Sequence, residues 1–181
     1  MKVLIAEDDA GELELYRVAF AARGHETVLT LNGEECVNAY KAALELLIKD
    51  RNKTGKTRPD HLLLPPPFDA VVLDYRMPKV DGLGAAQEIL RINKNQRIIF
   101  ASAYVKQTLA ESVKQFEQVI ELIQKPFEPK VLVELVEDTT MPAALHEINR
   151  LISQFDPSKP NDEQIEQLLD VLKKAQKVGL C

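Results

Sequence analysis

The 181-residue sequence has few of the side chains that build zinc or disulfide sites. It contains two cysteines and three histidines, Cys36, Cys181, His25, His61 and His146, at unrelated places. None of them follows a metal-ligand spacing, so a zinc site is not expected. We predict that Cys36 is a buried thiol on a helix and Cys181 a loose one, and a reducing compartment suits both.

Glycine, long apolar runs and excess charge are also scarce. Seven glycines occur, and none forms a glycine-rich loop after the first apolar run, which argues against a nucleotide cradle. No apolar run approaches membrane-spanning length, and the chain opens on a short apolar run without a charged leader, so we expect the cytoplasm. The net charge of -5 gives no electrostatic reason to seek nucleic acid or an anionic membrane.

The residues that are present predict one packed α/β domain with an appendage. Hydrophobic residues make up 45% of the chain and charged residues 28%, as in ordinary globular proteins. Short apolar runs alternate with helical patterns, and five of these runs are expected to be strands: 3–6, 27–31, 70–74, 98–102 and 119–123. This alternation predicts a doubly wound, mostly parallel sheet covered by helices on both faces.

Two segments are additional to the strands and helices of a doubly wound domain. Residues 50–68 are polar and proline-rich and are expected to form an inserted loop, in which Leu62, Leu63 and Leu64 either anchor it to the domain or contact a partner. The anchor is favoured, because exposed leucine clusters promote association. Residues 139–181 predict two amphipathic helices, too small to bury both apolar faces alone. They should dock on the sheet domain, residues 1–138, or pair with a second subunit as a homodimer.

Charged and hydroxyl side chains follow the predicted strands, where parallel sheets collect functional groups. Each has an ordinary structural explanation, such as a helix cap or a turn, but their joint placement at one sheet edge is hard to obtain by accident. The residues are Glu7, Asp8, Asp9, Asp74, Ser102 and Lys125. Gathered carboxylates repel unless a cation neutralises them, and an all-oxygen set suits magnesium.

Four ordered motifs carry a family resemblance. EDD after the first strand, LDYRMPKVDG after the third, ASA after the fourth and KPF after the fifth resemble the receiver domains of two-component response regulators. The resemblance covers residues 1–138 and implies a flavodoxin-like strand order, 2-1-3-4-5. It implies a chain that is not an enzyme in the usual sense, although it catalyses its own phosphoryl transfer and hydrolysis, with a sensor histidine kinase as its partner.

The resemblance also assigns roles to single residues. Asp74 would accept the phosphoryl group, and Asp8 and Asp74 would bind magnesium directly. Glu7 would hold the ion through water, and Arg76 through its backbone carbonyl. Ser102 and Lys125 would contact the phosphoryl oxygens. The resemblance further implies a cis bond between Lys125 and Pro126, which would aim Lys125 into the site.

One position departs from the family pattern. An aromatic residue often stands three positions before the lysine of strand five and moves inward on phosphorylation, whereas Leu122 stands there in this chain. Tyr104, two residues after Ser102, is a partial substitute or a residue at the site rim. We hypothesise that Tyr104 and Arg76 flank the phosphoryl group and hinder the attacking water.

Alternative functions are less well supported by the residues. A phosphatase with an aspartyl-phosphate intermediate would need an acid two residues after Asp74, where Arg76 stands. A DNA-binding output would need a basic element, but residues 139–181 carry five basic and six acidic side chains. We therefore expect signalling by contact with an effector protein. The alternative is a phosphorelay intermediate or phosphate sink that passes the group to a histidine phosphotransfer protein.

Overall fold

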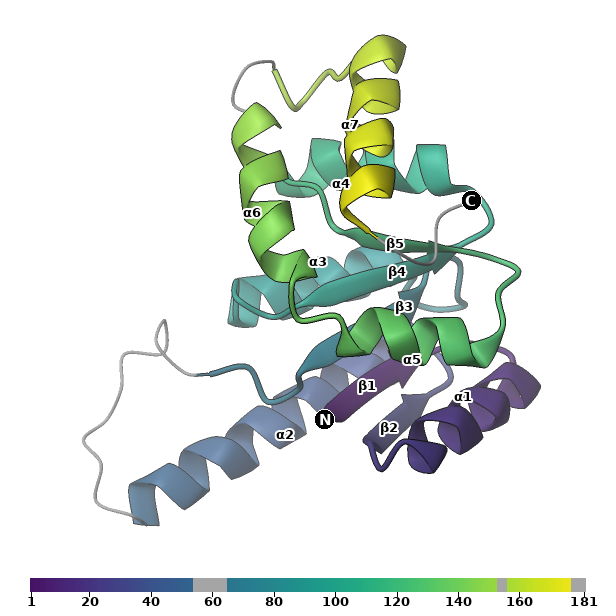
Figure 1. Ribbon diagram of the computed structural model, residues 1–181. Helices are drawn as coiled ribbons and strands as arrows, with labels where there is room; N and C mark the ends of the chain where they lie inside the picture. The colour runs from purple at the N-terminus through teal and green to yellow at the C-terminus, as the bar shows by residue number, and fades with distance from the viewer. Residues whose placement is uncertain (54–64, 153–155, 177–181) are drawn as a thin grey trace. The chain divides into compact units, whose positions relative to one another are not determined.

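The computed structural model describes residues 1–53, 65–152 and 156–176 (Figure 1). The predicted leucine anchor, Leu62 to Leu64, lies outside these residues, as does the thiol of Cys181. Five strands form one sheet in the order β2-β1-β3-β4-β5, which confirms the predicted doubly wound topology. Their bounds are β1 (Lys2–Ala6), β2 (Glu26–Thr30), β3 (Ala70–Asp74), β4 (Ile98–Ser102) and β5 (Glu121–Gln124).

Side chains set two strand boundaries that differ from the expected ones. The second strand ends at Thr30 because the next amide, Leu31 N–H, donates to the Glu35 carboxylate at 3.1 Å. The fifth strand begins at Glu121 rather than Val119. The backbone N–H of Val119 donates instead to Asn149 Oδ1 at 2.6 Å, so it is not free to join a strand ladder.

The chain divides into two compact units, residues 1–97 and 98–181. The first contains α1 (Ala10–Ala22), α2 (Gly33–Lys53) and α3 (Gly82–Ile92) with the first three strands. In this unit α1 covers one face of the sheet, and α2 and α3 cover the other (Figure 1). The strands β1 and β3 are buried along almost their whole length, as near-continuous apolar sequence predicts for parallel strands covered on both faces.

Local signals begin and end the helices of the first unit. The Asp9 carboxylate caps α1 by accepting from Gly11 N–H at 2.7 Å and Glu12 N–H at 3.0 Å. Gly24 follows the helix with a φ of +73°, a backbone conformation that glycine adopts without strain. Cys36 is a buried thiol on α2, and burial raises its pKa to about 12.

The second unit contains α4 (Val105–Phe116), α5 (Pro129–Glu137), α6 (Met141–Ile152) and α7 (Asp162–Ala175) with β4 and β5. Pro129 occupies the first turn of α5. Asn161 and Gln164 form a capping box at the start of α7. The helices α6 and α7 lie side by side, and α7 also packs on α4, so the predicted appendage docks on its own chain (Figure 1).

The boundary between the two compact units lies at residue 97, whereas the predicted boundary at residue 138 separates the receiver-like region from an extension. That predicted boundary stays a prediction. Among the described residues, no helix has the length and apolar character needed to cross a membrane.

Candidate functional site

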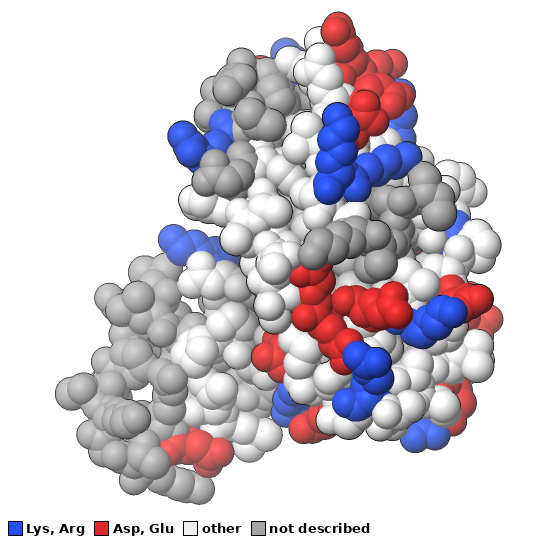
Figure 2. All heavy atoms as spheres, viewed as in Figure 1, with Lys and Arg blue, Asp and Glu red and all other residues white. Residues whose placement is uncertain are grey.

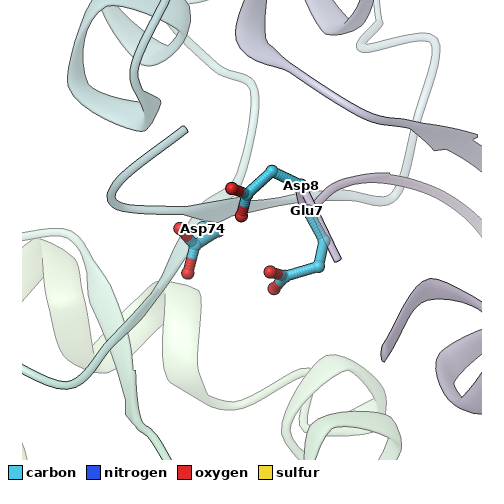
Figure 3. A group of neighbouring side chains, drawn as sticks. All are labelled: Glu7, Asp8 and Asp74. Atoms are coloured by element: carbon cyan, nitrogen blue, oxygen red, sulfur yellow. The ribbon is translucent and has the colours of Figure 1, made fainter. Parts of the chain in front are cut away.

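Three carboxylates meet at one edge of the sheet in the first unit (Figure 3). Glu7 and Asp8 follow β1, and Asp74 ends β3. Because β1 and β3 are adjacent parallel strands, with Ala6 opposite Leu73, their carboxyl ends meet at the same edge. One oxygen from each carboxylate lies within 4.8 Å of the others. The sequence prediction that these residues gather is therefore confirmed.

Burial makes this cluster electrostatically demanding. The side chain environments differ, since Glu7 is 3% exposed and Asp74 8% exposed, whereas Asp8 faces solvent. Negative charges this close repel more strongly away from water, because the local dielectric constant is lower. A divalent cation would offset the repulsion, and a set of three carboxylate oxygens suits magnesium, which keeps part of its hydration shell and could do so on the exposed side of Asp8. The donor set thus fits the predicted ion.

The chain after β3 holds Asp74 in place. Arg76 N–H donates to Asp74 Oδ2 at 2.9 Å, which orients the carboxylate toward the sheet edge. A β-carbon at Gly82 would lie 2.3 Å from the backbone oxygen of Asp74, so only glycine permits this close approach. The Asp81-Gly82 step is the start of α3, where the Asp81 carboxylate accepts from Gly84 N–H at 2.8 Å.

Tyr16 is a residue near this cluster whose polar role the sequence did not reveal. It lies on the buried stripe of α1 with Leu13 and Phe20, and its ring is buried. Its hydroxyl donates to Glu12 Oε2 at 2.9 Å. Burial raises the Tyr16 pKa above its ordinary value, the bond to Glu12 adds to the shift, and the charges of Glu7 and Asp74 raise it further. The i, i+4 spacing of Glu12 and Tyr16 was the available signal.

Ser102 ends β4 in the second unit and is buried against the start of α4. Its Oγ accepts from Tyr104 N–H at 2.9 Å and lies 2.8 Å from Thr108 Oγ1. Thr108 Oγ1 also lies 2.9 Å from the Tyr104 carbonyl oxygen. Thr108 could not be predicted from the sequence, because its contact with Ser102 depends on the residue at which α4 begins.

Lys125 follows β5, next to Ser102. The backbone N–H of Lys125 donates to the Ser102 carbonyl at 2.9 Å, and β4 and β5 are parallel with Ser102 opposite Gln124. The bond between Lys125 and Pro126 is cis, as the resemblance implied. The structure therefore places the predicted hydroxyl and ammonium residues at the ends of adjacent strands.

Tyr104 and Leu122, the two residues of the second unit that bear on the missing aromatic residue, differ in exposure. Tyr104 is 53% exposed and precedes the first turn of α4, without making a side-chain cap. Leu122 is fully buried in β5, which agrees with an apolar residue packed in the core. The predicted site residues therefore form two groups: Glu7, Asp8, Asp74 and Arg76 in the first unit, and Ser102, Tyr104, Leu122 and Lys125 in the second.

A parallel sheet in this order, with carboxylates after β1 and β3, defines a doubly wound protein with its site at the carboxyl ends of the strands. Residues 61–137 match the family model of the response regulator receiver domain. Over these residues the chain is similar to the receiver domains of response regulators.

Relatives and solved structures agree with that family. Chemotaxis protein CheY of Thermotoga maritima is 29% identical over 135 residues, which cover 74% of this chain and 92% of that protein. Sporulation initiation phosphotransferase F of Bacillus subtilis is 25% identical over 127 residues, covering 70% and 83%. A chain in the CheX-CheY complex of Borrelia burgdorferi, which contains BeF3 and Mg2+, superposes with a TM-score of 0.54 at 26% identity. That match covers 74% of this chain and 84% of the other.

Proposed function

We propose that this chain is a phosphoacceptor response regulator of a two-component system, phosphorylated on Asp74. The observation that carries the proposal is the convergence of Glu7, Asp8 and Asp74 at one sheet edge. The phosphodonor is a sensor histidine kinase, and the compartment is the cytoplasm, for which the buried free thiol of Cys36 is suited. The receiver comprises residues 1–138, and residues 139–181 form a helical extension.

The chain's own residues supply the nucleophile and its setting. A carboxylate oxygen of Asp74 attacks the phosphorus atom while the bond from phosphorus to the donor breaks, and the donor atom leaves with the electron pair. A carboxylate is a weak nucleophile, so its orientation matters, and the Arg76 N–H bond to Asp74 Oδ2 provides it.

The acidic cluster fits a magnesium ion, for which Asp8 and Asp74 would be direct ligands. Glu7 would hold the ion through water, and Arg76 through its backbone carbonyl. When bound, magnesium neutralises charge on the phosphoryl oxygens. The donor chemistry of the three carboxylates supports this assignment.

Ser102 and Lys125 are proposed to contact the phosphoryl oxygens from the second unit. Two observations support their joint action, since they end adjacent strands and the Lys125 N–H donates to the Ser102 carbonyl. An ammonium group beside the phosphoryl oxygens stabilises the charge that develops during transfer. The hydroxyl of Ser102 then senses the added charge.

The output is proposed to be contact with an effector protein. One similar solved structure is a complex of CheX with CheY, and this supports a protein partner for this chain. Acidic and basic side chains are interspersed on the face of the molecule seen in Figure 2, and such a mixed surface does not favour nucleic acid. The chain is not an enzyme acting on other substrates.

Replacing the acceptor tests the proposal directly. Incubation with acetyl phosphate and magnesium should label the wild type with one acid-labile phosphoryl group, and Asp74→Asn should abolish that label. Asp81→Asn is the matched control, because asparagine caps a helix as well as aspartate and Asp81 follows the same strand. Equal labelling of the Asp74→Asn variant would refute the acceptor assignment.

The second candidate function is a phosphorelay intermediate or phosphate sink. The similarity to a sporulation phosphotransferase is the observation that favours it. Phosphorylated chain mixed with a histidine phosphotransfer protein would return the group within minutes in a relay. Retention of the label on Asp74 would instead support signalling by protein contact.

A further inference from the structure

The C-terminal helices cover the surface formed by α4 and β5. The apolar stripe of α7, comprising Ile165, Leu168 and Leu172, is buried, and α7 packs against α4. On α4, Leu109 and Val113 are fully buried. Burying these large apolar side chains stabilises the docked arrangement, because it removes their apolar surface from water.

Polar contacts join the two ends of α7 to different elements. Near the start of α7, Glu166 Oε1 lies 2.7 Å from Lys106 Nζ in the first turn of α4. Just after the end of α7, the buried Gln176 Nε2 donates to the Leu122 carbonyl of β5 at 2.6 Å. Because β5 is the last strand in the sheet order, one of its sides has no neighbouring strand, and a side chain can reach its backbone.

The first turn of α4 is also where the Ser102 hydroxyl is engaged. Thr108, fully buried, lies one turn from the Tyr104 carbonyl and 2.8 Å from Ser102 Oγ. Ser102 Oγ accepts from both Tyr104 N–H and Thr108 Oγ1, so a serine side chain that rotates toward a phosphoryl oxygen carries Oγ away from both donors. A change of partner at Ser102 therefore acts on the same turn that carries Lys106.

Packing at this end of α7 leaves room for movement. A groove of about 570 Å³ lies between the start of α4 and the start of α7, lined by residues that include Tyr104, Lys106, Gln124, Pro160 and Ile165. A rearrangement of the first turn of α4 thus has space beside it and does not need to displace a close-packed core.

We infer that α4 and β5 form an interaction surface whose resting occupant is the chain's own α7, and that phosphorylation releases α7 by drawing Ser102 away from Thr108. The inference rests on the proposed phosphorylation of Asp74. The surface so uncovered takes an amphipathic helix with the chemistry of α7: apolar residues at the spacing of Ile165, Leu168 and Leu172, with a carboxylate opposite Lys106.

Hydrogen–deuterium exchange on the full chain tests the release. Beryllium fluoride with magnesium serves as the phosphoryl mimic, and its binding is followed separately by fluorine NMR. We expect the mimic to speed exchange at least severalfold in residues 105–116 and 162–175. Bound mimic with unchanged exchange in both segments would overturn the release while leaving the proposed function intact. Absence of a bound fluorine signal would overturn both.

Variants that break the docking test the surface without any phosphoryl mimic. Leu168→Asp places a charge in the buried stripe and should speed exchange of residues 105–116 to the level that the mimic produces. Gln167→Asp adds the same charge at an exposed neighbouring position and should behave as the wild type. Fast exchange in both variants, or in neither, would show that α7 does not cover α4.

A pair of charge-reversal variants tests the same docking in case Leu168→Asp does not fold. Glu166→Lys opposes Lys106 and should speed exchange of residues 162–175 by about two- to fivefold, as expected for one exposed ion pair. The double variant Lys106→Glu with Glu166→Lys should restore the wild-type rate. Failure of this rescue would place Glu166 away from Lys106 in solution.

Thr108→Val tests the link to Ser102. Valine keeps the shape of threonine but cannot hold the serine hydroxyl, so the mimic should act on exchange at a severalfold lower concentration. Ser112→Ala, which removes another buried hydroxyl of α4 bonded to the Leu109 carbonyl, is the control and should leave that concentration unchanged. An equal response in both variants would remove Thr108 from the mechanism.

Discussion

The polar side chains at the strand ends differ in kind between the two units. In the first unit, Glu7, Asp8 and Asp74 are carboxylates of the same negative sign, so together they favour binding of a cation. In the second, Ser102 and Thr108 already bond with each other and with the backbone of Tyr104. The first unit is therefore suited to binding a ligand. The second is suited to exchanging the hydrogen-bond partner of Ser102 when the charge nearby changes.

Removal of the metal should give the largest difference in response between the two units. A chelator should reduce labelling of Asp74 below detection, because the phosphoryl oxygens lose their counter-charge, and added magnesium should restore it. Exchange of residues 105–116 in the unphosphorylated chain should not respond, since Ser102 and Thr108 need no ion. A chelator effect on those residues would show that the acidic cluster and α4 are coupled before phosphorylation.

Gly82→Ala should disturb the first unit alone. The added methyl group would meet the Asp74 backbone oxygen at 2.3 Å, and we expect a loss of about 1–3 kcal/mol in the free energy of unfolding. Urea denaturation measures it. Gly84→Ala is the control, because its nearest neighbours are side-chain atoms at 3.2 and 3.3 Å, and alanine favours the helix. Equal destabilisation of both variants would contradict the close approach at Gly82.

Tyr104→Ala tests whether the second unit controls the lifetime of the product formed in the first. If the exposed ring hinders the attacking water, the phosphoaspartate should decay severalfold faster in the variant. Decay of isolated, labelled protein measures this. Gln107→Ala, which alters an exposed residue of the same groove, serves as the control. Unchanged decay in Tyr104→Ala would remove this role from Tyr104.

The smallest expected effect concerns pH and the ion pair of Lys106 with Glu166. Their hydrogen bond lowers the Glu166 pKa, with Lys173 adding to the shift, and raises the Lys106 pKa, with Asp162 adding to it. The Glu166 contribution is present above its ordinary pKa of 4.5 and is lost as pH falls through the lowered value. The Lys106 contribution is present below 10.5 and is lost as pH rises through the raised value.

Exchange of residues 162–175 measures this effect, with Glu166→Gln as the comparison. The variant should exchange slightly faster than the wild type at neutral pH, and the two should converge in acid. Raised salt should reduce the difference, because both side chains are exposed. A difference that persists in acid would assign the role of Glu166 to packing.

Apolar pattern and strand-end chemistry carried most of the fold and the acidic cluster. Parallel strands bring their carboxyl ends together whatever the details of packing, so Glu7, Asp8 and Asp74 could be grouped without coordinates. The contact between Ser102 and Thr108 could not be predicted, because it depends on the residue at which α4 begins. The start of β5 was misplaced because Val119 bonds to Asn149, thirty residues away in sequence.

The contact between Asn149 and Val119 also bears on how this chain can be cut. A shortened protein ending at residue 138 would lose α7. It would also lose Asn149, whose side chain accepts the hydrogen bond from the Val119 backbone N–H. The outer side of β5 and the apolar surface of α4 would then face water, which is the usual origin of edge-to-edge aggregation. A soluble shortened form would therefore need polar substitutions on α4, or a supplied helix in place of α7.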